Sequence, residues 1–305
     1  MYKIDCAMDS SHGPGKSQDR LTFLHRILSD GQYQTEGSDR ALYAIMDGVG
    51  GIPGGEVASS FCACEVINCP LESILADEGS QAVEKMESLI ENIDTSLKNA
   101  GAMATTLSGL LIVNSQNGLL FHVGNTRVWG LAGCYLRQLT TDHTQLVDME
   151  MQGVEITDAM RANIGHIITA SLGGSDNTLR KKLVVEWVSL DPYEAFLFTC
   201  DGVHEHVDIA ELENIVSCKK PLREAIDLAR KNGSKDDCSI MVVRKEEKAQ
   251  ENTVISEPTE EMSESRPEEK KAGAQEEASD SETNGLDSIL QGQQTGKRFS
   301  LFGRK

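Results

Sequence analysis

Aromatic residues and positive charge are both scarce in this chain. Aromatics make up 5% of its 305 residues, so the core must rest on aliphatic side chains. The 29 lysines and arginines face 48 acids, and the net charge of −19 argues against nucleic acid or an anionic membrane as the main partner. No apolar run approaches the ~18 residues of a membrane span, and the first residues lack the basic and apolar regions of a signal peptide. We therefore expect a cytoplasmic protein with no membrane span and no nucleic-acid partner.

Signatures of a protein nucleophile or a nucleotide loop are missing too. The chain has no Gly-x-Ser-x-Gly elbow and no Gly-x4-Gly-Lys-(Ser/Thr) phosphate loop. Its eight cysteines, without an export signal, indicate reduced thiols.

The most informative feature that is present is an apolar strand running straight into an acid and a glycine-rich turn. Residues 41–46 are apolar, and Asp47 and Gly48 follow them. A hard divalent cation takes oxygen ligands, which Asp47 can supply through its carboxylate and Gly48 through its carbonyl. Three more acids lie in comparable settings at expected strand edges: Asp19, Asp201 and Asp236. Acids placed in this way, far apart in sequence, indicate a carboxylate-built metal centre.

With these residues laid out, residues 1–245 resemble the metal-dependent (PPM-type, type 2C) protein serine/threonine phosphatases, especially their bacterial members. Ser17-Gln18-Asp19 is similar to the family's Asn-(Glu/Gln)-Asp element, and residues 47–51 resemble Asp-Gly-x-Gly-Gly. Further motif matches follow in family order at residues 55–59, 104–107, 122–127, 139–144, 169–173, 200–202 and 236–239. Each match is weak alone, but their shared order makes the resemblance specific.

The resemblance implies an α+β fold, a four-layer α-β-β-α sandwich with two central antiparallel sheets and a metal centre at one edge. It implies two ions, Mn²⁺ or Mg²⁺, because the ligands are all oxygens. Asp47 would bridge both ions, and the Gly48 carbonyl would serve the second. Asp201 and Asp236 would complete the shell of the first ion, and Asp19 would hold the second through water. The catalytic set is therefore Asp47, Asp201 and Asp236, and a metal-activated water would attack phosphoserine or phosphothreonine in line.

The chain departs from the family pattern at two sites that bear on this chemistry. No arginine precedes Asp19, where the family has one that clamps the phosphate, so Lys16 and His12 are the nearby cations left for weak phosphate binding. Asn125 stands where the family has a metal-linked aspartate, so a third ion is not expected. Phosphate binding should be weaker because the arginine before Asp19 is missing.

These departures leave alternatives open. One is a weak or inactive pseudophosphatase that acts as a phosphoprotein- or kinase-binding module. Retention of all four acids opposes it, since their mutual repulsion is costly without cations. Another is a Mg²⁺-dependent hydrolase of small phosphorylated metabolites. For the phosphatase, the expected partners are phosphorylated proteins and a cognate Ser/Thr kinase, and the expected state is a monomer.

A composition change after residue 245 predicts the domain boundary. Residues 246–287 hold 14 acids and 4 bases, and residues 288–305 hold 4 bases and no acids. Such a segment cannot bury enough apolar surface to offset its ordering entropy. We predict a phosphatase domain over residues 1–245 and a disordered acidic tail with a short basic C-terminus over residues 246–305.

Local patterns predict several elements inside the domain. Asn117-Gly118 favours a hairpin turn between strands at 106–113 and 119–123, because both turn positions of such a hairpin have φ > 0. A second strand pair should turn near Gly133. Helical spacing occurs at residues 56–67, 82–97 and 221–231.

Other polar residues favour structural roles. Arg127 is expected to pair internally, and His143 to hydrogen-bond at the start of a helix. His204 and His206 are expected to be solvated loop residues.

Overall fold

The computed structural model describes residues 1–76, 79–174 and 179–246, within a unit that spans Met1–Ala249. Of the predicted tail, only Glu246 is described; residues 247–305 lie outside the described part, so disorder and the boundary after Lys245 stay predictions.

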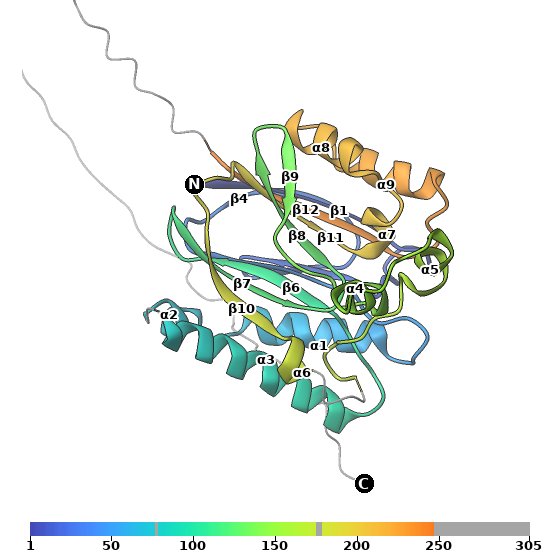
Figure 1. Cartoon of the computed structure of the whole chain (residues 1–305). Coiled ribbons are helices and arrows are strands. Elements are labelled where there is room, and N and C mark those ends of the chain that lie inside the picture. Colours follow the sequence, from blue (N-terminus) through green and yellow to red (C-terminus); the bar gives the residue numbers. More distant parts are fainter. Residues whose placement is uncertain (77–78, 175–178, 247–305) are drawn as a thin grey trace, which may run out of the picture. The chain divides into compact units, whose positions relative to one another are not determined.

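Two antiparallel six-stranded sheets form the centre of this unit (Figure 1). The first sheet has the order β4 (Gly31–Gly37), β1 (Tyr2–Asp9), β12 (Cys238–Lys245), β11 (Ala195–Thr199), β8 (Arg127–Ala132) and β9 (Tyr135–Gln138). The second has the order β10 (Val184–Ser189), β7 (Asn117–Val123), β6 (Leu107–Ile112), β5 (Ala41–Met46), β2 (Arg20–Phe23) and β3 (Arg26–Leu28).

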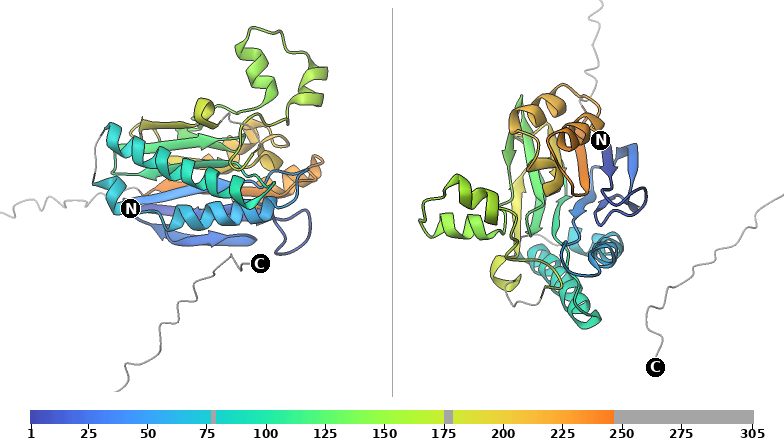
Figure 2. Two further views of the ribbon diagram at one scale, coloured as in Figure 1. Left: turned by 90° about the horizontal axis from the view of Figure 1, so that it is seen from below. Right: turned by 90° about the vertical axis from the view of Figure 1, so that its right-hand side faces the viewer.

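Helices cover the outer faces of both sheets, as Figure 1 shows. The second sheet carries α1 (Gly55–Ile67), α2 (Leu71–Leu75), α3 (Ser80–Ala100) and the short α6 (Leu179–Lys182). The first carries α7 (Asp201–His204), α8 (Ile209–Ser217) and α9 (Arg223–Lys231). A hairpin of α4 (Gln145–Met151) and α5 (Asp158–Ile164) projects from the sandwich in Figure 2, and α4 buries none of its residues. The predicted α-β-β-α architecture is therefore confirmed.

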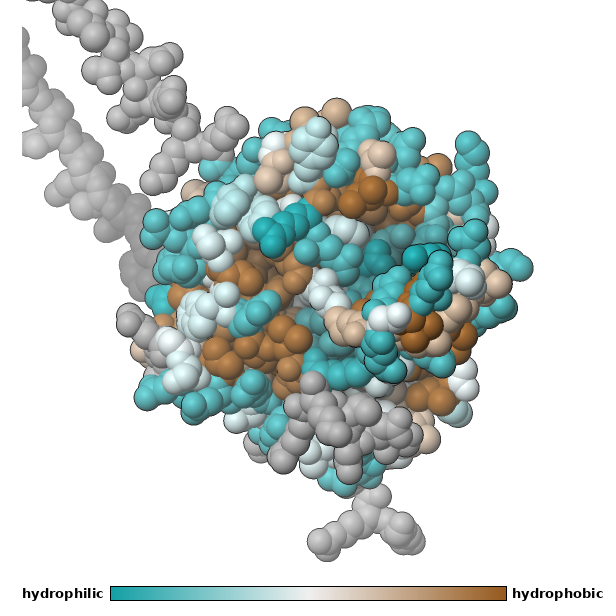
Figure 3. Space-filling model, in the orientation of Figure 1, coloured by the Kyte–Doolittle hydropathy of each residue, from teal (hydrophilic) through white to brown (hydrophobic). Residues whose placement is uncertain are grey.

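Strand β5 shows why the sheets stack in this way. All six of its residues are buried, and successive side chains point to opposite faces. Tyr43 and Ile45 enter the core between the sheets, whereas Ala44 and Met46 enter the core beneath α1 and α3. Each large apolar side chain buried in this way stabilises the fold by about 1.5–3 kcal/mol, so β5 links both cores. On the face that Figure 3 shows, hydrophilic residues predominate, and hydrophobic residues gather in several places, one of them around β7 and β10.

The predicted hairpin exists, but its turn is not at Asn117-Gly118. Both residues belong to β7, and the turn is formed by the preceding residues, where the Asn114 carboxamide oxygen accepts hydrogen bonds from the Gln116 and Asn117 amides. Gly118 lies where space is limited, because a Cβ there would lie 2.9 Å from Leu110 Cδ1 and 3.1 Å from the Leu111 carbonyl oxygen. The prediction of a two-residue turn was therefore wrong, while the turn near Gly133 (φ 60°) is confirmed.

The helices predicted at residues 56–67, 82–97 and 221–231 are confirmed as α1, α3 and α9. Within the described residues, no helix combines the length and apolarity that crossing a membrane requires.

Candidate metal centre

The four predicted acids meet at one end of the two sheets. Asp47 follows the last residue of β5, and Asp19 precedes β2, whose Arg20 pairs with Met46 of β5. On the other sheet, Asp201 begins α7 directly after β11, and Asp236 lies two residues before β12. Strands β11 and β12 are antiparallel neighbours, with Thr199 opposite Ile240. Chain topology therefore brings together acids that are up to 217 residues apart.

Electrostatic coupling among these acids is strong because several are withdrawn from water. Asp19 is 1% exposed, and burial followed by the charges of Asp237 and Asp201 raises its pKa to about 7. Burial, and then the charges of Asp19, Asp201 and Asp236, holds the pKa of Asp47 well above its ordinary value. Burial and the charge of Asp201 also raise the pKa of Asp236, although this side chain is on the exposed rim. Ionising the cluster is therefore costly unless positive charge is supplied.

Several oxygens in the cluster are buried without a hydrogen-bond partner in the structure: Asp19 Oδ1, Asp201 Oδ1 and Asn125 Oδ1. The second oxygens of the two acids are held, because Ser239 Oγ donates to Asp19 Oδ2 at 2.6 Å and Asn125 Nδ2 donates to Asp201 Oδ2 at 2.9 Å. Each aspartate thus has one anchored oxygen and one orphan oxygen. An all-oxygen donor set of this kind fits a hard divalent cation.

The described acidic side chains do not form a complete set of metal ligands in this structure. Among residues 1–76, 79–174 and 179–246, no three histidine, cysteine, aspartate or glutamate side chains are arranged to hold a metal ion. The oxygen donors and the raised pKa values of Asp19 and Asp47 nevertheless fit a cation.

Glycines allow the acidic loops to approach one another closely. A Cβ on Gly48 would lie 2.5 Å from the Gly55 carbonyl carbon and oxygen, so only glycine fits between Asp47 and the start of α1. A Cβ on Gly202 would collide with the Asp237 carbonyl oxygen, which packs β12 against α7. The Asp-Gly pairs are therefore required by packing around the acids.

Asp237 is a site residue that the sequence analysis missed. Its carboxylate accepts hydrogen bonds from the Ser11 amide at 2.7 Å and the Gln18 amide at 2.5 Å, and these bonds outweigh burial to lower its pKa. Asp237 therefore ties the loop that carries Asp19 to the start of β12. Its position beside Asp236 was the only signal in the sequence.

Arg230 is a second missed residue, and it holds the segment on the other side of Asp236. Its guanidinium donates to the carbonyl oxygens of Ser234 and Asp236 and to the Asp9 carboxylate at 3.0 Å. The backbone beside Asp236 is thus fixed to β1 and α9.

The two predicted phosphate-binding cations differ in where they lie. His12 Nδ1 is 3.6 Å from Asp237 Oδ1, so this exposed ring is at the edge of the acidic cluster. Lys16 is exposed, and its side chain has no hydrogen bond or ion pair with any described residue. Arg20 is no substitute for the missing arginine, because its guanidinium donates to the carbonyl oxygens of Ser17 and Asp19, each at 2.6 Å.

The expected structural roles of Arg127 and His143 are confirmed. Arg127 forms a two-pronged pair with Asp142, with Nη2 2.7 Å from Oδ2. His143 Nδ1 accepts a hydrogen bond from the Gly124 amide at 3.1 Å, just before α4 begins. The expectation of a solvated His204 was wrong. That residue lies on α7 and is 9% exposed, because Thr199 and the helix enclose it.

Cys238 and Arg244 have the spacing of a Cys-x5-Arg phosphate loop, but they do not form one. Strand β12 is extended, so its pairing with β1 places Cys238 opposite Asp9 and Arg244 opposite Lys3 at the other end. Burial raises the pKa of the Cys238 thiol to about 11, which disfavours a thiolate nucleophile.

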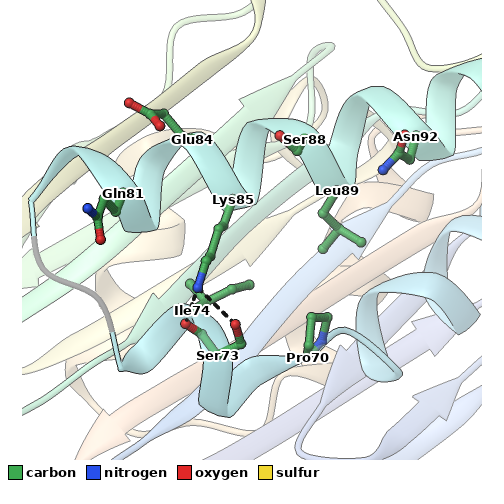
Figure 4. Close-up of a pocket in the computed structure, with 9 residues that line it drawn as sticks. All are labelled: Pro70, Ser73, Ile74, Gln81, Glu84, Lys85, Ser88, Leu89 and Asn92. Carbon is green, nitrogen blue, oxygen red and sulfur yellow. Dashed lines mark hydrogen bonds between the residues drawn. The ribbon is translucent and has the colours of Figure 1, made fainter.

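A groove between α2 and α3 lies away from the acids (Figure 4). Lys85 crosses it to donate to the Ser73 carbonyl at 2.9 Å and the Ser73 hydroxyl at 2.8 Å. Among the described residues that line it, Glu84 is the one acid.

Comparison with solved structures places this fold among the bacterial serine/threonine phosphatases. The phosphatase of Staphylococcus aureus is 22% identical, with a TM-score of 0.65 over 81% of this chain and 96% of that one. The catalytic domain of the phosphatase PstP in complex with two manganese ions is 19% identical, with a TM-score of 0.60 over 80% of this chain and 99% of that one.

Sequence comparison agrees. The phosphatase Stp of Listeria monocytogenes is 23% identical over 240 residues, 75% of this chain and 94% of the relative. PhpP of Streptococcus pneumoniae is 24% identical over 239 residues, 71% of this chain and 95% of the relative. No protein-family model matches the chain. The chain is therefore similar in fold and in sequence to bacterial serine/threonine phosphatases, which confirms the predicted resemblance.

Proposed function

We propose that this chain hydrolyses phosphoserine and phosphothreonine esters in proteins at a two-cation carboxylate site. The observation that carries the proposal is the cluster of Asp19, Asp47 and Asp201 at the sheet ends, where burial and mutual repulsion favour cations. The relatives are named serine/threonine phosphatases, so they support the enzyme and give no support to a binding module without turnover.

In this proposal the ions would be held by the carboxylates of Asp47, Asp201 and Asp236 and by the Gly48 carbonyl. Asp19 would contribute a further carboxylate to the second ion. Manganese or magnesium suits oxygen donors, and the manganese-bound PstP supports the choice. Once bound, such ions lower the pKa of water to make a nucleophile at neutral pH and stabilise charge on the phosphoryl group.

The chain's own residues position these groups. Ser239 and Asn125 each fix one carboxylate oxygen, at 2.6 and 2.9 Å, which leaves the second oxygen of Asp19 and of Asp201 to face a cation. The Asn125 carboxamide brings no negative charge to the site, so we propose two ions rather than three. His12 and Lys16 would attract the substrate phosphate as point charges without the bidentate fork of arginine.

The proposed setting is the cytoplasm, where a monomer acts on phosphorylated proteins and opposes a cognate Ser/Thr kinase. Eight free cysteines fit a reducing compartment.

Hydrolysis of p-nitrophenyl phosphate by the full chain tests the proposal. We expect turnover with Mn²⁺ or Mg²⁺ and none in excess EDTA, with restoration when the ion is added back. Release of phosphate from a phosphoserine peptide should show the same dependence. Undiminished turnover in EDTA would reject the two-cation mechanism.

A further inference from the structure

A second groove, of ≈790 Å³, lies at the opposite end of the first sheet from the acidic cluster. It is bounded by the ends of β1 and β12, by the segment before β11, and by the connection from α8 to α9. Its floor contains the buried apolar side chains of Tyr193, Ile215 and Leu222. Five of its described lining residues are cationic: Lys3, Lys219, Lys220, Arg244 and Lys245. Such a gathering of positive charge contrasts with the net charge of −19 of the whole chain.

The described lining residues also include four acids, and three of them interact electrostatically with cations of the groove. Arg244 lies in the field of Glu194 and Asp5, while Lys245 lies in the field of Asp191. The fourth acid is Glu246, beside Lys245 at the end of β12. Arg244 and Lys245 are also tied to the protein, since each donates to a backbone carbonyl at 2.6 Å. The side chains of Arg244 and Lys245 are therefore already engaged by groups of the protein itself.

The other three cations, Lys3, Lys219 and Lys220, form no ion pair with the residues that the structure describes. Lys3 stands directly opposite Arg244 in the β1–β12 pairing, and like charges placed in this way repel. Its neighbour on β4 is Glu36, with which it forms no ion pair. Lys3 also lies in the field of Asp5, so its charge is partly offset, whereas Lys219 and Lys220 have no ion-pair partner among the described residues.

Lys219 occupies a position where glycine is preferred. The Lys220 amide donates to the Ile215 carbonyl and the Lys219 amide to the Val216 carbonyl, which is the pattern of a helix end with a left-handed residue. Lys219 has φ 54°, a left-handed conformation that is unfavourable for a non-glycine residue. Part of this cost is offset because a cation near a helix C-terminus is favourable. A glycine here would thus retain the fold while removing one charge from the rim.

We propose that this groove docks an acidic segment of the phosphoprotein substrate, an inference that rests on the proposed phosphatase function. Carboxylate side chains would meet Lys3, Lys219 and Lys220, and an apolar side chain would contact the floor. An acidic ligand is repelled by most of the surface, so a local positive groove selects where it binds.

The sheet sets the spacing that such a substrate needs. Asp236 precedes the eight-residue strand β12, and Arg244 lies at its other end. At about 3.3 Å per residue, the groove is roughly 26 Å from the acidic cluster. An extended peptide covers at most ~3.6 Å per residue, so at least about eight residues must separate the phosphoserine from the acidic segment.

The first test measures docking without catalysis. A fluorescein-labelled, unphosphorylated glutamate-rich peptide is titrated with the full chain, and binding is followed by fluorescence anisotropy. We expect binding that weakens with added salt, and about tenfold weaker binding for the Lys219→Gly/Lys220→Ala double variant. Lys231→Ala removes an exposed charge outside the groove and should bind like the wild type. Equal binding by the double variant and the wild type would overturn the proposal.

The second test links docking to turnover. Two phosphoserine peptides carry the same glutamate segment after a linker of 3 or 14 glycine and serine residues. The longer linker should give a lower KM, and the double variant should lose this advantage while its p-nitrophenyl phosphate turnover stays unchanged. An advantage that persists in the double variant, or peptide binding with no effect of spacing, would overturn the assignment to substrate. If the wild type does not turn over p-nitrophenyl phosphate, the proposed function is refuted. The anisotropy titration would then still show whether the groove binds an acidic peptide.

Discussion

Replacing Asp19 by asparagine in the EDTA-stripped full chain should stabilise the fold at high pH. Asp19 is buried, and its pKa is raised from 3.8 to about 7 by burial and neighbouring carboxylates. Asparagine removes the negative charge but keeps a carboxamide oxygen that can accept from Ser239, 2.6 Å from Asp19 Oδ2. The substitution therefore relieves repulsion while it retains the shape of the side chain.

The magnitude follows from linkage. The folded state holds its proton more tightly than the unfolded state, so stability falls as pH rises from about 3.8 to 7 and stays lower above pH 7. About three pKa units at ~1.36 kcal/mol each correspond to roughly 4 kcal/mol when Asp19 is ionised. The hydrogen bond from Ser239 is already contained in this shift, so the expected net gain is roughly 4 kcal/mol. For a domain of this size, that gain raises Tm by roughly 8–16 °C.

Thermal and urea unfolding in EDTA, at pH 4 and pH 8, measure this effect. The variant should be more stable than the wild type at pH 8, and the difference should shrink towards zero at pH 4. Asp208→Asn, at an exposed position that makes no side-chain cap to α8, is the control and should show no pH-dependent gain. A destabilised Asp19→Asn chain at pH 8, or a gain independent of pH, would refute the electrostatic reasoning.

Three further outcomes are expected. Burial lowers the pKa of His122 to about 4, so its contribution to stability is complete above pH 6.5 and is lost as pH falls towards 4. His122→Gln should therefore flatten the pH dependence of the free energy of urea unfolding in this window. An unchanged pH profile would contradict this assignment to His122. Arg230→Lys should weaken Mn²⁺ activation of phosphatase activity several-fold because Asp236 loses its fixed backbone, whereas an unchanged activation constant would show that this anchor is not needed. Lys16→Ala should raise KM more than it lowers kcat, and Lys16→Arg should lower KM; identical kinetics for all three chains would exclude this segment from the phosphate site.

Many of the strands and helices around the site could be predicted because local sequence patterns determine them. Strand β5 is an uninterrupted apolar run that stops at Asp47, and α3 repeats apolar residues at helical spacing. The turn before β7 was mispredicted because the pattern at Asn117-Gly118 fits a two-residue turn. Packing against Leu110 explains Gly118, and Asn114 supplies the turn contacts instead.

The acids of the candidate centre could be selected from sequence because each follows or precedes an apolar strand. The residues that hold these acids in place could not be predicted, because the contacts join segments that are far apart in the chain. Asp237 binds the amides of Ser11 and Gln18 across 226 and 219 residues, and no local pattern encodes that pairing. His204 was misjudged for a related reason, since its burial depends on Thr199 and on the packing of α7 against β11.

The central claim, that Asp47 and its neighbours form a two-cation site, is tested most directly by calorimetric titration of Mn²⁺ into the EDTA-stripped and dialysed full chain. The account predicts two manganese ions per wild-type chain. It predicts that Asp47→Asn loses at least one of them while it remains folded by circular dichroism. A wild-type chain that binds no manganese, or an Asp47→Asn chain that binds two ions with unchanged affinity, would contradict the account.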